Sequence, residues 1–296
     1  MIRGQHQQKG FHITGMDILV GLLIMGGLAF IAYRIHIRLD YKWHWETVPQ
    51  YMFRYDESTE SWTPNLLMQG FFNTIRLSVW SCILAVIIGM ITGIMRTGRS
   101  LFGRLVGGTY VECIRNLPPL ILIFIFYFFV SDQIIPLLGI ESFLYGCSQG
   151  TQSLISFVAA PPRMITAFLS ALITLAVFEG AYITEIVRAG IQSVDKGQWE
   201  ASAALGMDRF QQMRHVILPQ ALRTILPPLG SQFISTIKDS AIVSVISIQE
   251  LTFQGMEFMA STRLTFEAWI TVTALYLVLT LTCSLAVGRL EMRLSS

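Results

Sequence analysis

Charged residues are scarce in this sequence. Only 14% of its 296 residues are Asp, Glu, Lys or Arg, while 53% are hydrophobic; an average soluble domain has roughly 25% charged residues. A chain of this composition does not have enough polar groups to cover itself in water, so we expect its solvent to be lipid. The formal net charge is only +2, and no basic stripe is interleaved with aromatic residues, so nothing in the sequence predicts binding to nucleic acid.

Motifs for catalysis and metal binding are lacking as well. The sequence has no phosphate-binding loop of the form Gly-x-x-x-x-Gly-Lys-Ser/Thr, so we do not expect the chain to hydrolyse ATP. It also has no His-Glu-x-x-His and no Cys-x-x-Cys. The four cysteines and five histidines are scattered, which predicts neither a disulfide framework nor a metal site. We therefore expect a protein that is not an enzyme and has no cofactor of its own.

Six apolar segments predict membrane-spanning helices. They cover residues 18–33, 65–95, 110–130, 164–189, 226–248 and 268–288. A span needs about 20 apolar residues; the first segment is slightly short, but Arg34 and Arg38 can extend it by reaching the headgroups. A secretory signal peptide is the alternative for this segment, and we favour a membrane helix. In the second segment, Gly89 and Gly93 form a small-xxx-small pair that permits close contact with another helix.

Basic residues indicate the orientation of the chain. They gather in the loop at 96–104, in the polar segment at 188–223 and after residue 288, and the positive-inside rule places these regions in the cytoplasm. Both termini are then cytoplasmic. Residues 34–54 fit the rule poorly, because their four basic residues would lie on the outer side.

The most informative stretch is a polar segment at 198–219 between two apolar ones. Its first half is rich in helix-forming residues, and Gly206 follows them where a helix ends in the left-handed conformation. Asp208 and Gln211 have the spacing of a capping box for a second helix. We expect Leu218-Pro219 to end that helix, because proline lacks the backbone donor. Two short helices joined at a glycine are typical of a segment that fits a groove in another protein.

The same segment carries a family resemblance. Glu200-Ala201-Ser202, followed by Gly206, Val216 and Leu218-Pro219, resembles the EAA loop of ABC importer permeases, with Ser202 and Val216 as small departures from the family pattern. Residues 185–201 resemble the polar amino acid branch, the permeases for histidine, glutamine and glutamate. The alternative, an ordinary amphipathic cytoplasmic linker, is disfavoured by the number of positions that match at fixed spacing.

This resemblance implies an all-α integral membrane protein with the ABC importer permease fold. Five core transmembrane helices would lie in a domain at 65–296, which includes a cytoplasmic coupling loop at 190–220. Residues 1–64 would add an N-terminal tail, an extra transmembrane helix and a periplasmic aromatic-rich segment at 38–64, since Trp and Tyr favour the membrane interface. The residues that would couple to an ATPase are Glu200, Ala201, Ser202, Gly206, Phe210, Leu218 and Pro219.

The resemblance also implies partners. Two cytoplasmic ATP-binding subunits would bind and hydrolyse ATP with Mg²⁺, and a second permease subunit, identical or homologous, would complete the substrate path. A periplasmic or extracellular binding protein would deliver the amino acid. We therefore expect a multi-pass protein of the bacterial inner membrane that couples closure of the ATPase to alternating access.

Ionisable residues within the apolar segments suggest a substrate path, since each costs at least about 2.5–3.5 kcal/mol at membrane depth. Asp239 lies twelve residues beyond Pro227, or roughly 18 Å along a helix, which would place it near the midplane of the membrane with Lys238 beside it; we weigh substrate binding by this pair equally against an internal ion pair. Glu185 and Arg188 are expected to pair with each other at the start of the coupling loop. The candidates for the path are Glu112, Arg115, Asn116, Glu179, Lys238, Asp239 and Ser240; the first three precede a second double proline, and broken helices commonly frame transporter sites.

Two other functional classes stay open on sequence alone. The first is a secondary transporter or channel driven by an ion gradient, which would show an inverted repeat with paired broken helices. The double prolines at 118–119 and 227–228 echo such a repeat only faintly. The second is a membrane scaffold or sensor that transports nothing, which would need no polar face beside Asp239.

Overall fold

The computed structural model describes residues 15–38, 41–57 and 60–294 and divides into two compact units, Met1–His44 and Trp45–Ser296. Most of the predicted N-terminal tail, residues 1–14, lies outside the described residues. The first unit contains α1 (Gly15–Arg38), which confirms the prediction of a helix at 18–33. The apolar stretch recognised in it, Gly15–Gly27, is by itself shorter than a membrane span.

The second unit is built around two long helices, α3 (Leu66–Thr97) and α9 (Ile165–Gln192), which run parallel and pack along most of their length. Gly89 and Gly93 of α3 lie against Ile183 and Val187 of α9 so closely that a Cβ at either glycine would collide with the facing side chain. This contact confirms the predicted role of the glycine pair, because small residues let two helix backbones approach.

The predicted span at 110–130 is wrong as a single helix. The chain forms α4 (Leu101–Asn116) and α5 (Pro119–Phe129), and their axes are bent by 117°. Leu117 between them is extended (φ −96°, ψ 148°), since the residue before a proline is pushed out of the helical region. Pro119 then occupies the first helical position of α5, which suits proline. The basic loop expected at 96–104 is also shorter than predicted, because Arg104 belongs to α4.

The predicted span at 226–248 begins too late. Helix α12 (Leu218–Asp239) starts eight residues earlier and contains Pro227 and Pro228 in its interior. It continues into a 3₁₀ segment, η5 (Ser240–Ile246). Asp239 therefore ends the α-helix and does not lie midway along it. The chain turns at Ser247 and forms α13 (Leu251–Thr262) and α14 (Thr265–Leu294).

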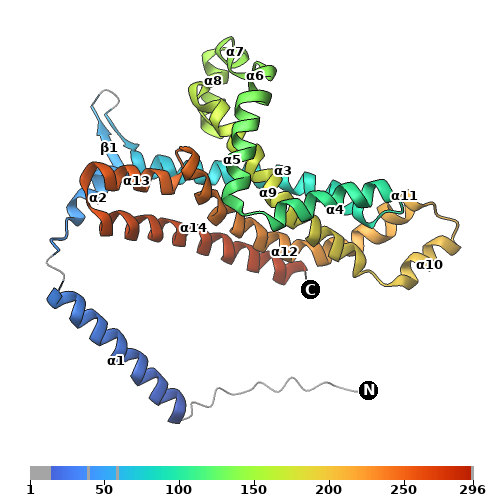
Figure 1. The fold of residues 1–296 in the computed structure, drawn as a ribbon, viewed down its shortest axis with the longest axis horizontal. Helices are drawn as coiled ribbons and strands as arrows, with labels where there is room; N and C mark the ends of the chain where they lie inside the picture. Colours follow the sequence, from blue (N-terminus) through green and yellow to red (C-terminus); the bar gives the residue numbers. More distant parts are fainter. Residues whose placement is uncertain (1–14, 39–40, 58–59, 295–296) are drawn as a thin grey trace. The chain divides into compact units, whose positions relative to one another are not determined.

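Shorter elements cover the ends of these helices. At one end lie η1 (Trp45–Thr47), α2 (Val48–Met52) and an antiparallel hairpin of β1 (Phe53–Asp56) and β2 (Ser61–Pro64). Between α5 and α9 the chain forms η2 (Val130–Ile134), α6 (Ile135–Leu138), α7 (Ile140–Tyr145), α8 (Gln149–Val158) and η3 (Pro162–Met164). Figure 1 shows the hairpin beside α13 at one end of the helices, and α10 and α11 at the opposite end.

Length and composition mark three stretches of the described chain as able to cross a membrane: α3, the run Pro162–Gln192 and Thr265–Arg289 of α14. The bent pair α4–α5 makes a fourth if it counts as one span. Helix α12 has 22 residues but carries polar side chains and two internal prolines, so composition does not mark it, although the sequence analysis counted it among six spans. The all-α membrane fold is as predicted.

Candidate functional site

The polar segment at the end of α9 forms the helix α10 (Lys196–Ala204). It ends as the sequence predicts: Gly206 is left-handed (φ 78°), its N–H donates to the carbonyl of Ala203 (3.0 Å), and Met207 N–H donates to Ser202 (3.2 Å). These two bonds are a Schellman motif. Because the left-handed conformation strains residues with a Cβ, glycine is the residue best suited to this turn.

The predicted capping box is also present. Asp208 accepts a hydrogen bond from Gln211 N–H (2.8 Å), and the Gln211 side chain accepts one from Asp208 N–H (2.9 Å). However, the short helix that follows, α11 (Arg209–Gln211), does not end at Leu218-Pro219. It continues through a π-helical turn, η4 (Gln212–Ile217), into α12. Pro219 stands in the first turn of α12, where its missing N–H costs no hydrogen bond within that helix.

The polar segment at 198–219 is called the coupling segment below. The helical run 209–239 joins it to the end of α12, where Asp239 lies. A cross-link strengthens the base of the segment, where Gln220 of α12 donates to the Gln198 side chain of α10 (3.1 Å). The Arg209 guanidinium lies 5.3 Å from the centroid of the Trp199 ring. Helix α10 thus contacts α12 through Gln220 and α11 through Arg209.

The predicted coupling residues divide into a buried and an exposed set. Ser202 is 2% exposed and donates to the Trp199 carbonyl (3.0 Å). Glu200, Ala201, Gly206 and Pro219 are exposed, and Leu218 is half-buried. Phe210, Met213 and Ile217 recur at helical spacing but do not form one buried face, because Ile217 is fully buried whereas Phe210 is 69% exposed.

Leu205, which the sequence analysis did not single out, is 77% exposed beside the Gly206 turn. Leu205 and Phe210 are the large hydrophobic side chains that the segment 196–217 exposes. Such residues are typical of a docking contact.

Glu179 of α9 is the centre of a buried polar cluster. It is fully buried, and Gln232 of α12 donates to its Oε2 atom (2.6 Å). Its other oxygen, Oε1, has no hydrogen-bond donor among the described residues. The Asp239 carboxyl lies beside the Glu179 carboxyl, and Thr236 is a second polar neighbour. Glu179 and Asp239 thus belong to one cluster. Gln232 belongs to it as well, but the sequence did not indicate this residue, because a neutral amide does not stand out among ionisable residues.

The other candidates for the substrate path make different contacts. Lys238 is exposed, and Ser240 is buried with its hydroxyl donating to the Ile237 carbonyl (2.7 Å). Glu112 accepts a hydrogen bond from the Asn116 amide (2.8 Å), and the Arg115 guanidinium stacks 5.5 Å from the ring centroid of Tyr182.

The expected pair of Glu185 and Arg188 is confirmed, with Nη2 and Oε2 2.8 Å apart. The structure adds Arg96, from the end of α3, which forms an ion pair with the second carboxylate oxygen of Glu185. Arg188 also donates to the side chain of Gln192 (2.6 Å). This ion-pair cluster ties α3 to α9 one turn before the coupling segment.

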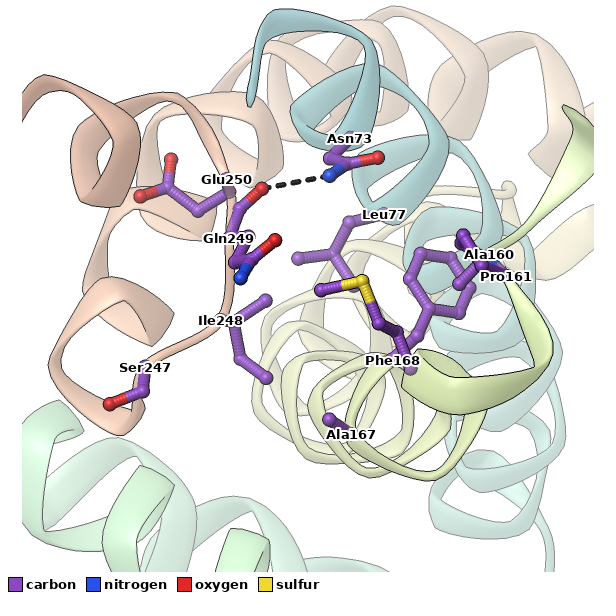
Figure 2. Close-up of a pocket in the computed structure, with 11 residues that line it drawn as sticks. Asn73, Leu77, Ala160, Pro161, Ala167, Phe168, Ser247, Ile248, Gln249 and Glu250 are labelled. Atoms are coloured by element: carbon purple, nitrogen blue, oxygen red, sulfur yellow. Dashed lines mark hydrogen bonds between the residues drawn. The ribbon is translucent and has the colours of Figure 1, made fainter. Parts of the chain in front are cut away.

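A small cavity lies at the opposite end of α3 and α9 (Figure 2). Its volume of about 50 Å³ has room for a few water molecules. Asn73 donates across it to the Gln249 carbonyl (2.8 Å). Glu250 turns its carboxylate away from the cavity, as Figure 2 shows, and caps α13 by accepting from the N–H groups of Thr252 (2.9 Å) and Phe253 (2.8 Å).

One motif was overlooked in the sequence. Residues 146–150 have the spacing Gly-x-Ser-x-Gly found around the nucleophile of serine hydrolases. Ser148 is the N-cap of α8 and accepts from Thr151 N–H (3.4 Å). It follows a helix and not a strand, so the structural context of a nucleophile elbow is not present.

Comparison with known proteins places these features in a family. Residues 61–296 match the family described as "Binding-protein-dependent transport system inner membrane component". The chain is 35% identical over 232 residues to the probable glutamine ABC transporter permease protein GlnM of Bacillus subtilis, covering 78% of this chain and 94% of that protein. It is 34% identical over 229 residues to the glutamine transport system permease protein GlnP of Escherichia coli (77% and 93% covered). The glutamate/aspartate import permease protein GltJ of Escherichia coli is 31% identical over 213 residues (72% and 80% covered).

Solved structures agree with the sequence relatives. A chain of an amino acid ABC transporter crystallised with histidines matches with a TM-score of 0.65 and 31% identity, over 86% of this chain and 100% of that one. The MetNI methionine ABC transporter in an inward-facing conformation matches with a TM-score of 0.57 and 19% identity, over 77% and 96%. The second likeness supports the fold alone.

Proposed function

Because this chain belongs to the family of binding-protein-dependent transport system inner membrane components, we propose that it is the permease subunit of an ATP-driven importer for polar amino acids. The relatives are permease proteins, so the chain is a component of a transport system and not an enzyme. The observation that carries the proposal is the continuous helical run 209–239, which begins at the exposed coupling segment and ends at the Glu179–Asp239 cluster.

Coupling would begin at the exposed tip of the segment. Leu205 and Phe210 would fit the groove of a cytoplasmic ATP-binding subunit, with Glu200 and Ala201 beside them, and the Gly206 turn would hold the tip in shape. Closure of two such subunits around ATP and Mg²⁺ would move α10. The run 209–239 and the Gln198–Gln220 hydrogen bond would carry that movement into α12, and the ion-pair cluster would carry it into α3 and α9.

The substrate would be recognised at the cluster between α9 and α12. A buried carboxylate oxygen without a donor, next to a second carboxyl, is suited to a cationic or amide donor. The α-ammonium group that all amino acids share would supply such a donor. Relatives named for glutamine and for glutamate and aspartate, and a solved transporter with histidines, support polar amino acids as the class.

Glu179 is fully buried in this conformation, so the substrate would reach it only when α9 and α12 move apart. Alternating access provides that movement. Asp239 and Glu179 are then the residues closest to the substrate, with Ser240 and Lys238 beside Asp239 in the chain. Glu112, Arg115 and Asn116, at the bend between α4 and α5, would line the path on the side of the coupling segment.

The proposed assembly contains four further components besides this chain: two ATP-binding subunits, a second permease subunit and an extracellular or periplasmic binding protein. The chain itself would hold no cofactor. It would lie in the bacterial inner membrane with both termini in the cytoplasm, which places the coupling segment on the same side as the ATPase.

The experiment that tests this function uses the complete transporter in proteoliposomes. The chain is co-expressed with its cognate ATP-binding subunit and reconstituted with its cognate binding protein. Uptake of radiolabelled glutamine, glutamate and histidine is then measured with and without ATP inside the vesicles. We expect ATP-dependent uptake of at least one of them. Uptake that runs on an ion gradient without ATP would show a secondary transporter instead, and a thermal-shift screen of the binding protein against the twenty amino acids would identify the substrate.

A further inference from the structure

The β-hairpin of β1 and β2 has one aromatic face and one polar face. Its register pairs Phe53 with Pro64 and Tyr55 with Trp62, while Arg54 pairs with Thr63 and Asp56 with Ser61. Because successive side chains of a strand point to opposite faces, the first two pairs lie on one face of the hairpin and the last two on the other. A hairpin with this alternation requires an apolar environment on one side only.

The aromatic face is not covered by the rest of its own unit. Trp62 is 71% exposed, Tyr55 50% and Phe53 41%. The rings of Tyr55 and Trp62 contact each other edge to face, with centroids 5.7 Å apart. An isolated two-stranded hairpin is at best marginally stable in water, so we expect this face to have a partner.

The base of the hairpin is fixed at the level where the long apolar helices begin. Asn65 closes it by donating its N–H to the Met52 carbonyl (2.9 Å), and α3 starts at the next residue. Tyr51, just before β1, packs on Phe258 of α13 with ring centroids 4.5 Å apart. Val48 belongs to the same buried cluster as Ala268 in the first turn of α14.

Both α3 and α14 contain stretches able to span a membrane, and both begin beside the hairpin. Their first turns therefore mark the surface of the membrane on the side opposite to the coupling segment. Figure 1 shows the hairpin standing out sideways from this end of the helices, close to α13.

We propose that this hairpin lies on the membrane surface at that end, with its aromatic face in the lipid at the boundary between headgroups and acyl chains. Trp and Tyr are the residues most enriched in that layer, because their rings are apolar and their N–H and O–H groups remain hydrated. No charged side chain occupies a paired position of the aromatic face. Glu57 and Glu60 lie at the tip of the hairpin, where their carboxylates keep the tip in water and the hairpin parallel to the surface. The hairpin then acts as an anchor that fixes the height of α3 in the bilayer.

The test is site-directed spin labelling of the full-length chain in nanodiscs of phosphatidylcholine and phosphatidylglycerol. The native cysteines at 82, 113, 147 and 283 are first replaced by alanine, and the background is accepted when it keeps the transport activity of the parent. Two matched pairs of neighbours are then labelled: Trp62→Cys with Ser61→Cys, and Tyr55→Cys with Arg54→Cys. The members of each pair differ by one position but face opposite sides.

The accessibility of each label to oxygen, which concentrates in lipid, and to a water-soluble nickel chelate decides the result. We expect the labels at 62 and 55 to have an oxygen-to-nickel ratio several-fold higher than those at 61 and 54. Nickel access at all four positions would overturn the proposal, because the aromatic face would then lie in water. Protection of 62 and 55 from both reagents would also overturn it, because a protein surface would then cover the face.

Discussion

Gln232 donates a hydrogen bond of 2.6 Å to Glu179, although the two residues are 53 positions apart and belong to different helices. The bond joins α9, which leads into the coupling segment, to α12, which leads out of it. Only one of the two oxygens of Glu179 is used in this way. The same carboxyl group is thus part of the contact between the two helices and, as proposed above, an acceptor for the substrate.

Glu179→Gln tests the second role. The amide keeps the shape of the side chain and an oxygen for Gln232, but it cannot ionise, so the cluster of two carboxyls loses a negative charge that would attract a substrate ammonium group. A charged hydrogen bond contributes about 1.5–3 kcal/mol, so uptake in proteoliposomes should fall about tenfold or more, while the amount of assembled transporter stays the same. Glu257→Gln, an exposed carboxylate on α13, is the matched control and should transport normally. If Glu179→Gln transports as well as the parent, the cluster is structural.

Local sequence signals predicted the coupling segment well. The Gly206 turn and the Asp208–Gln211 capping box are determined by residues three or four positions apart, and the structure contains both. The continuation of the second helix past Pro219 was not predicted. Proline is a helix breaker in the interior but a good residue in the first turn, and the sequence does not show which of these positions it occupies.

The contacts of the deep site depend on packing and were harder to predict. The interior position of Pro227 and Pro228 moved the start of α12 by eight residues, and with it the expected depth of Asp239. Arg96 joins Glu185 across 89 residues, and no periodicity in the sequence links them. The glycine pair at 89 and 93 was informative because its spacing matches one face of a helix, although it did not identify α9 as the partner.

Phe210→Ala and Met213→Ala separate docking from folding. Phe210 is 69% exposed, so its replacement should leave the melting temperature of the purified chain within about 1 °C but reduce the ATPase subunit that co-purifies. Met213 is half-buried against the cluster that contains Ile217, so Met213→Ala should lower the melting temperature. Equal co-purification of the ATPase with Phe210→Ala and with the parent would remove Phe210 from the docking surface.

Glu185→Gln should weaken the junction between α3 and α9. It leaves Arg96 and Arg188 close together with no carboxylate between them, and the side chains of Arg96 and Glu185 are only 17% and 21% exposed. Loss of a mostly buried charged partner costs about 1–3 kcal/mol, so the melting temperature in detergent should fall by several degrees. Glu141→Gln is the control, since Glu141 is exposed and accepts from Thr166; a fall of the same size there would show that the effect is not specific to the ion-pair cluster.

Gly206→Pro should uncouple the transporter without removing it from the membrane. Proline requires φ near −65°, whereas Gly206 has φ of 78° and donates its N–H to Ala203, so the substitution destroys both the turn and one of its hydrogen bonds. The measurement is ATP hydrolysis in the reconstituted complex with and without the loaded binding protein. We expect the stimulation by the binding protein to disappear in Gly206→Pro and to persist in Gly206→Asn, because asparagine tolerates the left-handed region better than other residues with a Cβ. Stimulation that survives in the proline variant would mean that the turn between α10 and α11 does not transmit the movement.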